Sequence, residues 1–183
     1  MAVDRPAVGA AALLLVLVGA AASRPAHAAP LALSVDVGTG LGVARSTGTA
    51  APATTLAFRE DARLSLGGWW AVHPRVALRL ELSASVERVE LAVRGGVRVR
   101  LAAWATHGLV YAGADLGALA ATLIGTVELG ARLGVLWRFG CRSTGCWGGV
   151  YAELGVAGWV WPARAAFLDG RVGLMLSAPS FWR

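Results

Sequence analysis

The chain has 183 residues, a formal net charge of +6 and 56% hydrophobic residues, and all 17 basic residues are arginines because it contains no lysine. That hydrophobic fraction exceeds the roughly 45–50% that is usual for soluble domains, even though the usual figure also counts glycine. The positive charge by itself would fit a nucleic-acid partner, but most arginines share their segments with acidic residues. We therefore predict that the chain has no nucleic-acid partner.

The first segment in chain order has the features of a secretory signal peptide. Arg5 precedes an apolar run over residues 8–22, and a series of small residues ending at Ala29 follows it. The alternative is an uncleaved membrane anchor, but the run is shorter than the roughly 20 apolar residues that a spanning helix needs. We predict that residues 1–29 are removed on export and that residues 30–183 form a single domain.

The segment 76–87 shows most clearly the pattern on which the fold prediction rests. Its even-numbered positions, such as Leu78 and Leu80, are all apolar, whereas Arg79 and Glu81 lie at odd-numbered positions. Side chains of a strand alternate between its faces, so this segment predicts a strand with one apolar and one charged face. The same alternation predicts eight strands, at residues 31–43, 56–72, 76–87, 89–105, 109–120, 126–139, 147–161 and 164–182.

The connections between these strands differ in kind. Compact turns are predicted at residues 73–75, 106–108 and 141–146, and the longest irregular stretch lies at residues 44–55. Eight antiparallel strands of this kind predict a closed barrel. The alternation alone does not say which face lies inside. In a soluble lipocalin-like carrier the apolar face lines a ligand cavity, whereas in an outer-membrane barrel it meets lipid.

The positions of the aromatic residues favour the membrane barrel. They gather near the predicted strand ends, as expected for two girdles at the two interfaces of a membrane. The alternative is that they close the ends of a soluble barrel. The predicted girdle residues are Trp70, Trp104, Trp137, Phe139, Tyr151, Trp159, Trp161, Phe181 and Trp182.

The composition of the polar faces also favours the membrane barrel. They contain many small residues, such as Gly38, Gly130 and Gly134, which suit the crowded interior of a narrow barrel. They also carry charges of both signs, Arg94 among them, and an arginine fork can bridge several buried carboxylates. The alternative is a set of scattered surface ion pairs, each contributing ~0–1 kcal/mol. The predicted lumen network consists of Asp36, Asp61, Arg63, Arg79, Glu81, Arg98, Arg100, Asp115, Glu128, Arg132, Arg138, Glu153, Asp169 and Arg171.

The remaining reactive residues give little sign of catalysis. Cys141 and Cys146 are the only cysteines, and an exported location permits the disulfide that we predict between them. No histidine or carboxylate lies near them in sequence, so we predict no metal site, and we predict no cofactor. His73 and His107 fall in predicted turns, and no Gly-x-Ser-x-Gly motif occurs, so we predict no catalytic residues.

The alternating strands, the export signal, the aromatic residues near strand ends and the terminal Phe181-Trp182 pair resemble the small outer-membrane barrels of the OmpA-transmembrane-domain and OmpX type. The resemblance is one of pattern and covers nearly all of residues 30–183. It implies an all-β, eight-stranded antiparallel up-and-down transmembrane β-barrel in the outer membrane of a Gram-negative-type envelope. It also implies that the compact turns face the periplasm.

The resemblance further implies two partners, namely outer-membrane lipid and the barrel assembly machinery. In that family the machinery reads an aromatic residue at the end of the last strand. This chain departs from the pattern, because Pro179 lies inside the expected strand and Arg183 follows the aromatic pair.

Side chains just fill an eight-stranded barrel, so we expect a structural or interaction role without catalysis. Two alternatives stay open: a narrow outer-membrane pore, and a soluble periplasmic lipocalin-like binder of an apolar ligand.

Overall fold

The computed structural model describes residues 31–45, 54–85, 90–104, 107–121, 124–143, 145–161, 164–177 and 181–182, so the predicted signal peptide lies outside the described residues. The strands are β1 (Leu31–Arg45), β2 (Thr54–His73), β3 (Val76–Ser85), β4 (Glu90–Trp104), β5 (Gly108–Ala121), β6 (Ile124–Arg142), β7 (Gly145–Trp161) and β8 (Arg164–Ser177).

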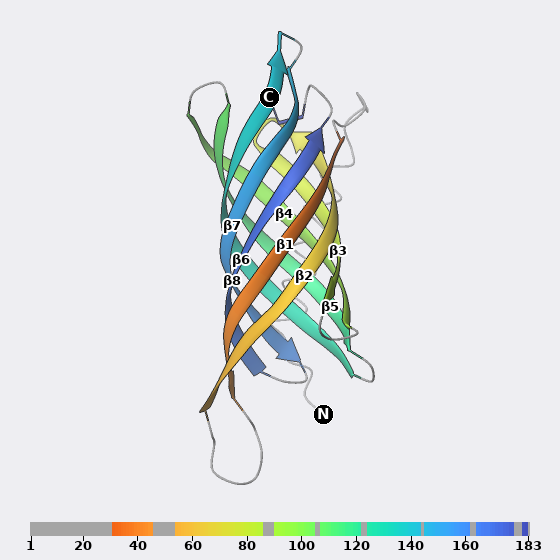
Figure 1. Cartoon of the computed structure of the whole chain (residues 1–183), viewed down its shortest axis with the longest axis vertical. Coiled ribbons are helices and arrows are strands. Elements are labelled where there is room, and N and C mark those ends of the chain that lie inside the picture. Colours follow the sequence, from red (N-terminus) through yellow and green to blue (C-terminus); the bar gives the residue numbers. More distant parts are fainter. Residues whose placement is uncertain are drawn as a thin grey trace.

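The eight strands form one closed barrel. Each strand pairs antiparallel with its neighbour in sequence, and β1 pairs with β8 to complete the ring (Figure 1). This architecture confirms the predicted eight-stranded antiparallel up-and-down barrel. The described residues include no helix that is long and apolar enough to cross a membrane.

Two predicted boundaries are corrected. β8 ends at Ser177, so Phe181 and Trp182 are not part of the last strand, and the strand stops two residues before Pro179, which has no N–H to donate. The third compact turn is shorter than predicted, because β6 continues to Arg142 and β7 begins at Gly145. Cys141 and Cys146 therefore lie opposite each other on paired strands.

The two ends of the barrel differ in their connections. We call the end at which β2 meets β3, β4 meets β5 and β6 meets β7 the turn end, and the end at which residues 46–53 join β1 to β2 the loop end. In Figure 1 the turn end is at the top and the loop end at the bottom.

The apolar face of the strands lies on the outside of the barrel. Leu33 and Leu154 are each 60% exposed and Leu80 is 50% exposed, whereas Arg79 and Glu81, the neighbours of Leu80, are each 3% exposed. The alternation of period two thus places the oily side chains outward and the charged ones inward. This is the arrangement expected of a barrel whose solvent is lipid.

Glycines lie directly opposite several of the largest inward-facing side chains. Asp115 pairs with Gly96 on β4, and Tyr111 pairs with Gly134 on β6. A Cβ atom added to Gly96 would collide with the carboxylate of Asp115, and one added to Gly134 would collide with the ring of Tyr111. The small residues of one strand therefore leave the room that the bulky residues of the next strand fill.

Candidate functional site

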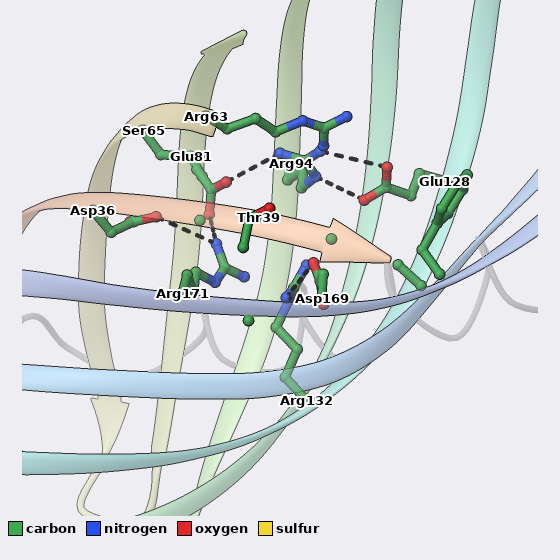
Figure 2. Close-up of a pocket in the computed structure, with 15 residues that line it drawn as sticks. Asp36, Thr39, Arg63, Ser65, Glu81, Arg94, Glu128, Arg132, Asp169 and Arg171 are labelled. Atoms are coloured by element: carbon green, nitrogen blue, oxygen red, sulfur yellow. Dashed lines mark hydrogen bonds and ion pairs between the residues drawn. The ribbon is translucent and has the colours of Figure 1, made fainter. Parts of the chain in front are cut away.

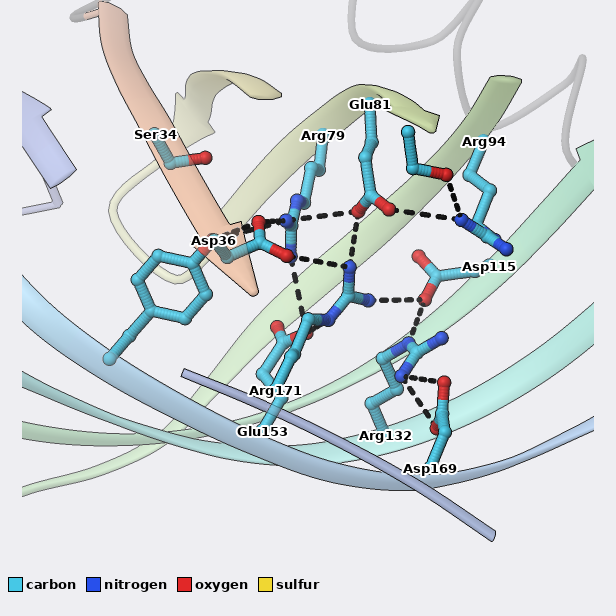
Figure 3. Close-up of polar contacts among 12 residues, drawn as sticks. Ser34, Asp36, Arg79, Glu81, Arg94, Asp115, Arg132, Glu153, Asp169 and Arg171 are labelled. Carbon is cyan, nitrogen blue, oxygen red and sulfur yellow. Dashed lines mark hydrogen bonds and ion pairs between the residues drawn. The ribbon is translucent and has the colours of Figure 1, made fainter. Parts of the chain in front are cut away.

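The lumen is the candidate site because it gathers the buried charged side chains. Within the part of the chain that the structure describes, ten charged residues are at most 8% exposed and point into the barrel, and Figure 3 shows most of them in mutual contact. They are Asp36, Arg79, Glu81, Arg94, Arg98, Asp115, Glu128, Arg132, Glu153 and Arg171. Because burying an unpaired charge is very costly, the contacts of each one decide whether the arrangement is stable.

Arg98 is the most deeply buried of these residues, with no exposed surface. Its guanidinium donates to Asp115 through Nη1 (2.6 Å to Oδ1) and Nη2 (3.0 Å to Oδ2). Its Nε donates to Oε1 of Glu153 at 2.9 Å. One planar fork thus bridges carboxylates from β5 and β7, which is the geometry that favours arginine over lysine in buried pairs.

Arg79 forms the second bridge, on the side of β1. Its Nη2 lies 2.7 Å from Oδ2 of Asp36 and 2.9 Å from Oε2 of Glu81, and its Nη1 lies 3.1 Å from Oε2 of Glu153. The hydroxyl of Tyr151 donates to the same Asp36 oxygen at 2.5 Å. Glu153 therefore accepts from Arg79 and Arg98 at once.

Arg171 joins these two bridges. Its Nε lies 2.5 Å from Oε2 of Glu153, its Nη1 pairs with Glu81, and its Nη2 lies 3.5 Å from Oδ2 of Asp115. Asp115, Glu153 and Glu81 are thereby linked through a single guanidinium group on β8. Contacts of this kind require all the contributing strands to be in register at once.

Arg94 and Arg132 extend the network toward the loop end. Arg94 donates to Glu128 at 2.9 Å and to Glu81 at 3.1 Å. Arg132 donates to Asp115 at 2.5 Å and to Asp169 at 2.7 Å. We call the eleven residues joined in this way the ion-pair network: Asp36, Arg79, Glu81, Arg94, Arg98, Asp115, Glu128, Arg132, Glu153, Asp169 and Arg171.

The charges of the ion-pair network nearly balance. Five arginines face six carboxylates, which gives a formal charge of 5 − 6 = −1. Arg63 of β2 is half-buried and lines a small cavity beside Arg94, as Figure 2 shows, and including it equalises the two charges. That cavity measures about 40 Å³, which holds a few water molecules at most.

The turn end of the lumen is filled by aromatic rings instead. We call Trp69, Tyr111, Tyr151, Phe181 and Trp182 the aromatic plug; each is at most 3% exposed. The ring centroids of Trp69 and Tyr111 lie 5.9 Å apart and those of Tyr111 and Trp182 5.4 Å apart, in the edge-on and tilted geometries that aromatic pairs prefer. The backbone of Trp182 adopts φ 53°, a left-handed conformation that is uncommon outside glycine.

The aromatic plug rests directly on the ion-pair network. The guanidinium of Arg79 lies 4.8 Å from the centroid of Trp69, and that of Arg98 lies 5.8 Å from it. The indole Nε1 of Trp69 donates to the hydroxyl of Ser34 at 3.0 Å. The described lumen is therefore filled from the turn end through the middle of the barrel by two layers that touch each other.

The predicted lumen residues differ in where the structure places them, and Arg63 lines the small cavity described above. The structure brings Asp36, Arg79, Glu81, Arg98, Asp115, Glu128, Arg132, Glu153, Asp169 and Arg171 into mutual contact. The prediction fails for Arg100, which joins none of the ion pairs among the described residues. Arg138 lies at the turn end, where it donates to the backbone carbonyl of Trp182 at 3.4 Å. The side chain of Asp61 lies outside the described residues.

The predicted aromatic girdle is wrong for four residues. Tyr151, Phe181 and Trp182 are buried in the aromatic plug. Trp159 shares its face with lumen residue Glu128, and its ring lies 4.8 Å from that of buried Phe167. A ring near a strand end can point to either side of the barrel wall, so position along the strand is not enough.

The other predicted girdle residues are placed as follows. Trp104 is 42% exposed and Trp137 51% exposed, and Trp70 and Phe139 are half-buried. All four lie near the turn end. The side chain of Trp161 lies outside the described residues.

Some site residues were not included in the predicted network. The sequence placed Arg94 on a polar face, with the same even-numbered parity on β4 as Arg98, but the predicted network did not include it. Tyr151 has the same parity as Glu153 on β7, which also marks it as inward-facing. Ser34 has the same parity as Asp36 on β1, which marks it as inward-facing in the same way.

The predicted disulfide is present between Cys141 and Cys146. The structure adds a neighbour that the sequence did not show, since Nδ1 of His107 lies 3.1 Å from Sγ of Cys141. His107 belongs to the connection between β4 and β5, 34 residues away along the chain.

No protein-family model matches the sequence, and no curated protein matches it. Solved structures do match. A chain described under the de novo design of transmembrane β-barrels superposes with a TM-score of 0.53 at 13% identity, over 85% of this chain and 100% of that chain. Neisserial surface protein A, NspA, gives 0.49 at 8% identity, over 79% of this chain and 96% of that one. The N-terminal β-barrel domain of Pseudomonas aeruginosa OprF gives 0.48 at 10% identity, over 78% and 97%. The designed barrel shows that this chain has the fold of a small transmembrane β-barrel.

Proposed function

We propose that this chain is a closed β-barrel of the outer membrane that acts as a structural or interaction protein, without catalysis and without a conducting pore. The single observation that carries the proposal is that two contacting layers, the aromatic plug and the ion-pair network, fill the described lumen. A barrel of eight strands has an interior that side chains can fill, and these side chains do so.

The outer surface supports a lipid environment. Among the described residues, leucines and valines of every strand except β5 are exposed around the wall, with Leu66 and Leu176 each 61% exposed. Trp104 and Trp137 lie outside at the turn end, where amphipathic rings would meet a membrane interface. Together with the predicted export signal, this surface supports the outer membrane as the location.

The same surface argues against a soluble carrier. Such a carrier needs its apolar face inside, around a ligand, but the apolar face of this barrel is outside. The cavity inside is lined by charged residues and holds a few water molecules at most, which does not suit an apolar ligand.

Fractionation of cells that express the chain tests the location. We expect the protein in the outer-membrane fraction, extracted only by detergent, and we expect its gel mobility to change on boiling as the barrel unfolds. Release by osmotic shock without detergent would contradict the membrane assignment.

Single-channel recording in a planar bilayer tests whether the lumen is closed. We expect no steady conductance from the wild-type chain. A steady current that changes in the Arg98→Ala variant, measured on protein that still shows heat-modifiable mobility, would instead establish the narrow pore.

A further inference from the structure

A second site lies at the turn end, away from the ion-pair network. There the connection between β4 and β5 meets the hairpin of β6 and β7. His107, Cys141 and Cys146 each offer one ligand atom, and these three atoms all lie within 4.8 Å of one another. They are the three side chains that a Cys₂His site would require.

The backbone holds these three residues in place independently of the disulfide. Cys141 and Cys146 are direct cross-strand partners in the register of β6 and β7. The carbonyl of His107 accepts from the backbone N–H of Arg138 at 2.8 Å, which ties the β4–β5 connection to β6. The carbonyl of Cys146 accepts from the hydroxyl of Ser177 at 3.1 Å. The residues would therefore stay close together if the S–S bond opened.

Opening the bond changes the chemistry of the site. A dithiol reductant gives up two electrons and two protons and becomes a disulfide itself, while the bond between Cys141 and Cys146 breaks and both become thiols. A metal cation then displaces one proton from each thiol and binds the two thiolates, which are the ligating form of cysteine. Nδ1 of neutral His107 supplies a third donor.

We propose that reduction of the Cys141–Cys146 disulfide turns these two cysteines and His107 into a Cys₂His binding site for a thiophilic divalent cation such as Zn²⁺. Bonds of about 2.3 Å to sulfur and 2.0–2.1 Å to nitrogen put tetrahedral ligands about 3.5–3.8 Å apart. The present spread of the ligand atoms, up to 4.8 Å, needs little adjustment to reach that geometry. Two thiolates and an imidazole favour zinc or softer cations over magnesium and calcium.

The proposal does not rest on the function proposed above. The three residues lie at the turn end, away from the ion-pair network. A failure to bind metal would therefore leave the closed barrel unaffected, and a conducting lumen would leave the metal site unaffected.

The test uses the full chain, folded in detergent micelles and reduced with a phosphine, which takes up an oxygen atom from water and leaves no competing thiol. The phosphine is removed under anaerobic conditions, and Co²⁺ is added as a spectroscopic probe. We expect a thiolate-to-cobalt charge-transfer band at one cobalt per chain. Zn²⁺ should abolish the band by displacement, and competition with a chromophoric chelator then gives the zinc affinity.

Four comparisons make the test specific. The oxidised chain should show no band, and Cys141→Ser should lose it. His107→Ala and the closer-sized His107→Gln should each weaken zinc binding at least tenfold. His73→Ala is the matched control, because His73 is the last residue of β2, next to the turn before β3, and accepts from the backbone N–H of Arg75 at 3.1 Å. It should bind zinc as the wild type does.

Heat-modifiable gel mobility establishes that each variant is folded before its affinity is compared. The proposal is overturned if the reduced, folded chain gives no charge-transfer band. It is also overturned if both His107 variants bind zinc as tightly as the wild type, because two thiols alone would then explain the binding and the pair would be a structural disulfide only.

Discussion

The aromatic plug and the ion-pair network fill neighbouring layers of one lumen by opposite means. The plug uses a few large rings such as Trp69 and Trp182, whose packing depends on shape and on excluded water. The network uses forks such as Arg98 and Arg171, whose contacts depend on orientation and charge. Burial of the rings is favourable by itself, whereas burial of the charges becomes tolerable only when every partner is in place.

This contrast indicates that the two layers contribute to the fold in different ways. The plug stabilises the barrel by adding apolar burial inside a wall whose own apolar face points to lipid. The network specifies which strands lie beside which, because its ion pairs draw on β1 and on each of β3 to β8 and misregistered strands would leave charges unpaired. The predictions that follow separate these contributions, beginning with the largest expected effect.

Removal of a network arginine should be the most damaging change. Arg98→Met keeps most of the volume but leaves Asp115 and Glu153 without their bidentate partner, and breaking a buried pair in this way costs about 3–5 kcal/mol. The free energy of unfolding from a denaturant titration in micelles measures the loss. Arg100→Met, on the same strand, is the matched control and should change that free energy by less than about 0.5 kcal/mol. Equal effects of the two variants would show that the network contributes nothing specific.

Truncation within the plug should cost nearly as much. Trp69→Ala removes a fully buried indole, and such changes cost about 3–5 kcal/mol, toward the lower end where neighbours can relax. Trp137→Ala, outside the barrel, is the control and should cost less in the same titration. Trp69→Phe keeps a buried aromatic ring, although a smaller one, and loses the hydrogen bond to Ser34, so we expect a loss of about 1 kcal/mol from that bond. A plug that mattered little would give similar values for Trp69→Ala and Trp137→Ala.

A charge on the outer wall should be less damaging but still clear. Leu80→Arg places a guanidinium on the exposed apolar face of β3, and we expect a loss of about 2–4 kcal/mol if the position lies near the middle of the bilayer. The free energy of folding into lipid vesicles measures it. Leu80→Ala separates the loss of the leucine from the arrival of the charge. If Leu80→Arg were harmless and Arg79→Leu severe in aqueous solution, the two faces would have been assigned backwards.

Loss of the disulfide should have the smallest of these effects. The bond closes a short loop, and the chain-entropy estimate gives about 2 kcal/mol for it. The Cys141→Ser/Cys146→Ser double variant should therefore unfold at slightly lower denaturant concentration than the oxidised wild type. A chelator must be present throughout, so that metal binding cannot replace the lost bond. A reductant should lower the wild-type stability and leave the double variant unchanged; sensitivity of both would point to an effect of the reductant elsewhere.

The sequence predicted the wall of the barrel well, because strand alternation is local. The parity that separates Leu80 from Arg79 can be followed through each strand without knowing which strands are neighbours. That is why all eight strands and most network residues were predicted. Arg138 lies beyond the middle of its strand, at the turn end where aromatic rings fill the lumen, so strand parity alone could not say which partner it would contact.

The contents of the lumen were harder to predict because they depend on contacts across the barrel. Nothing near Trp182 in sequence indicates that its ring packs against Tyr111, and the expectation that it would sit in the last strand took no account of the strand stopping at Ser177. The contact of His107 with Cys141 likewise appears only when β4–β5 and β6–β7 are placed side by side. Register between strands, and not the pattern within one strand, decides such contacts.

The glycines that face bulky partners have a consequence for redesigning this barrel. At Gly96 and Gly134 the wall has no side chain, and Asp115 and Tyr111 of the neighbouring strand occupy the space beside it. Such side chains could be replaced by smaller ones, with acidic and basic residues removed together so that no charge is left unpaired. If the rings of the aromatic plug were also replaced by smaller side chains, a water-filled channel would open without lengthening or adding a single strand. The diameter of that channel would depend on which side chains were replaced, so one closed barrel could be engineered into a series of channels of different diameters.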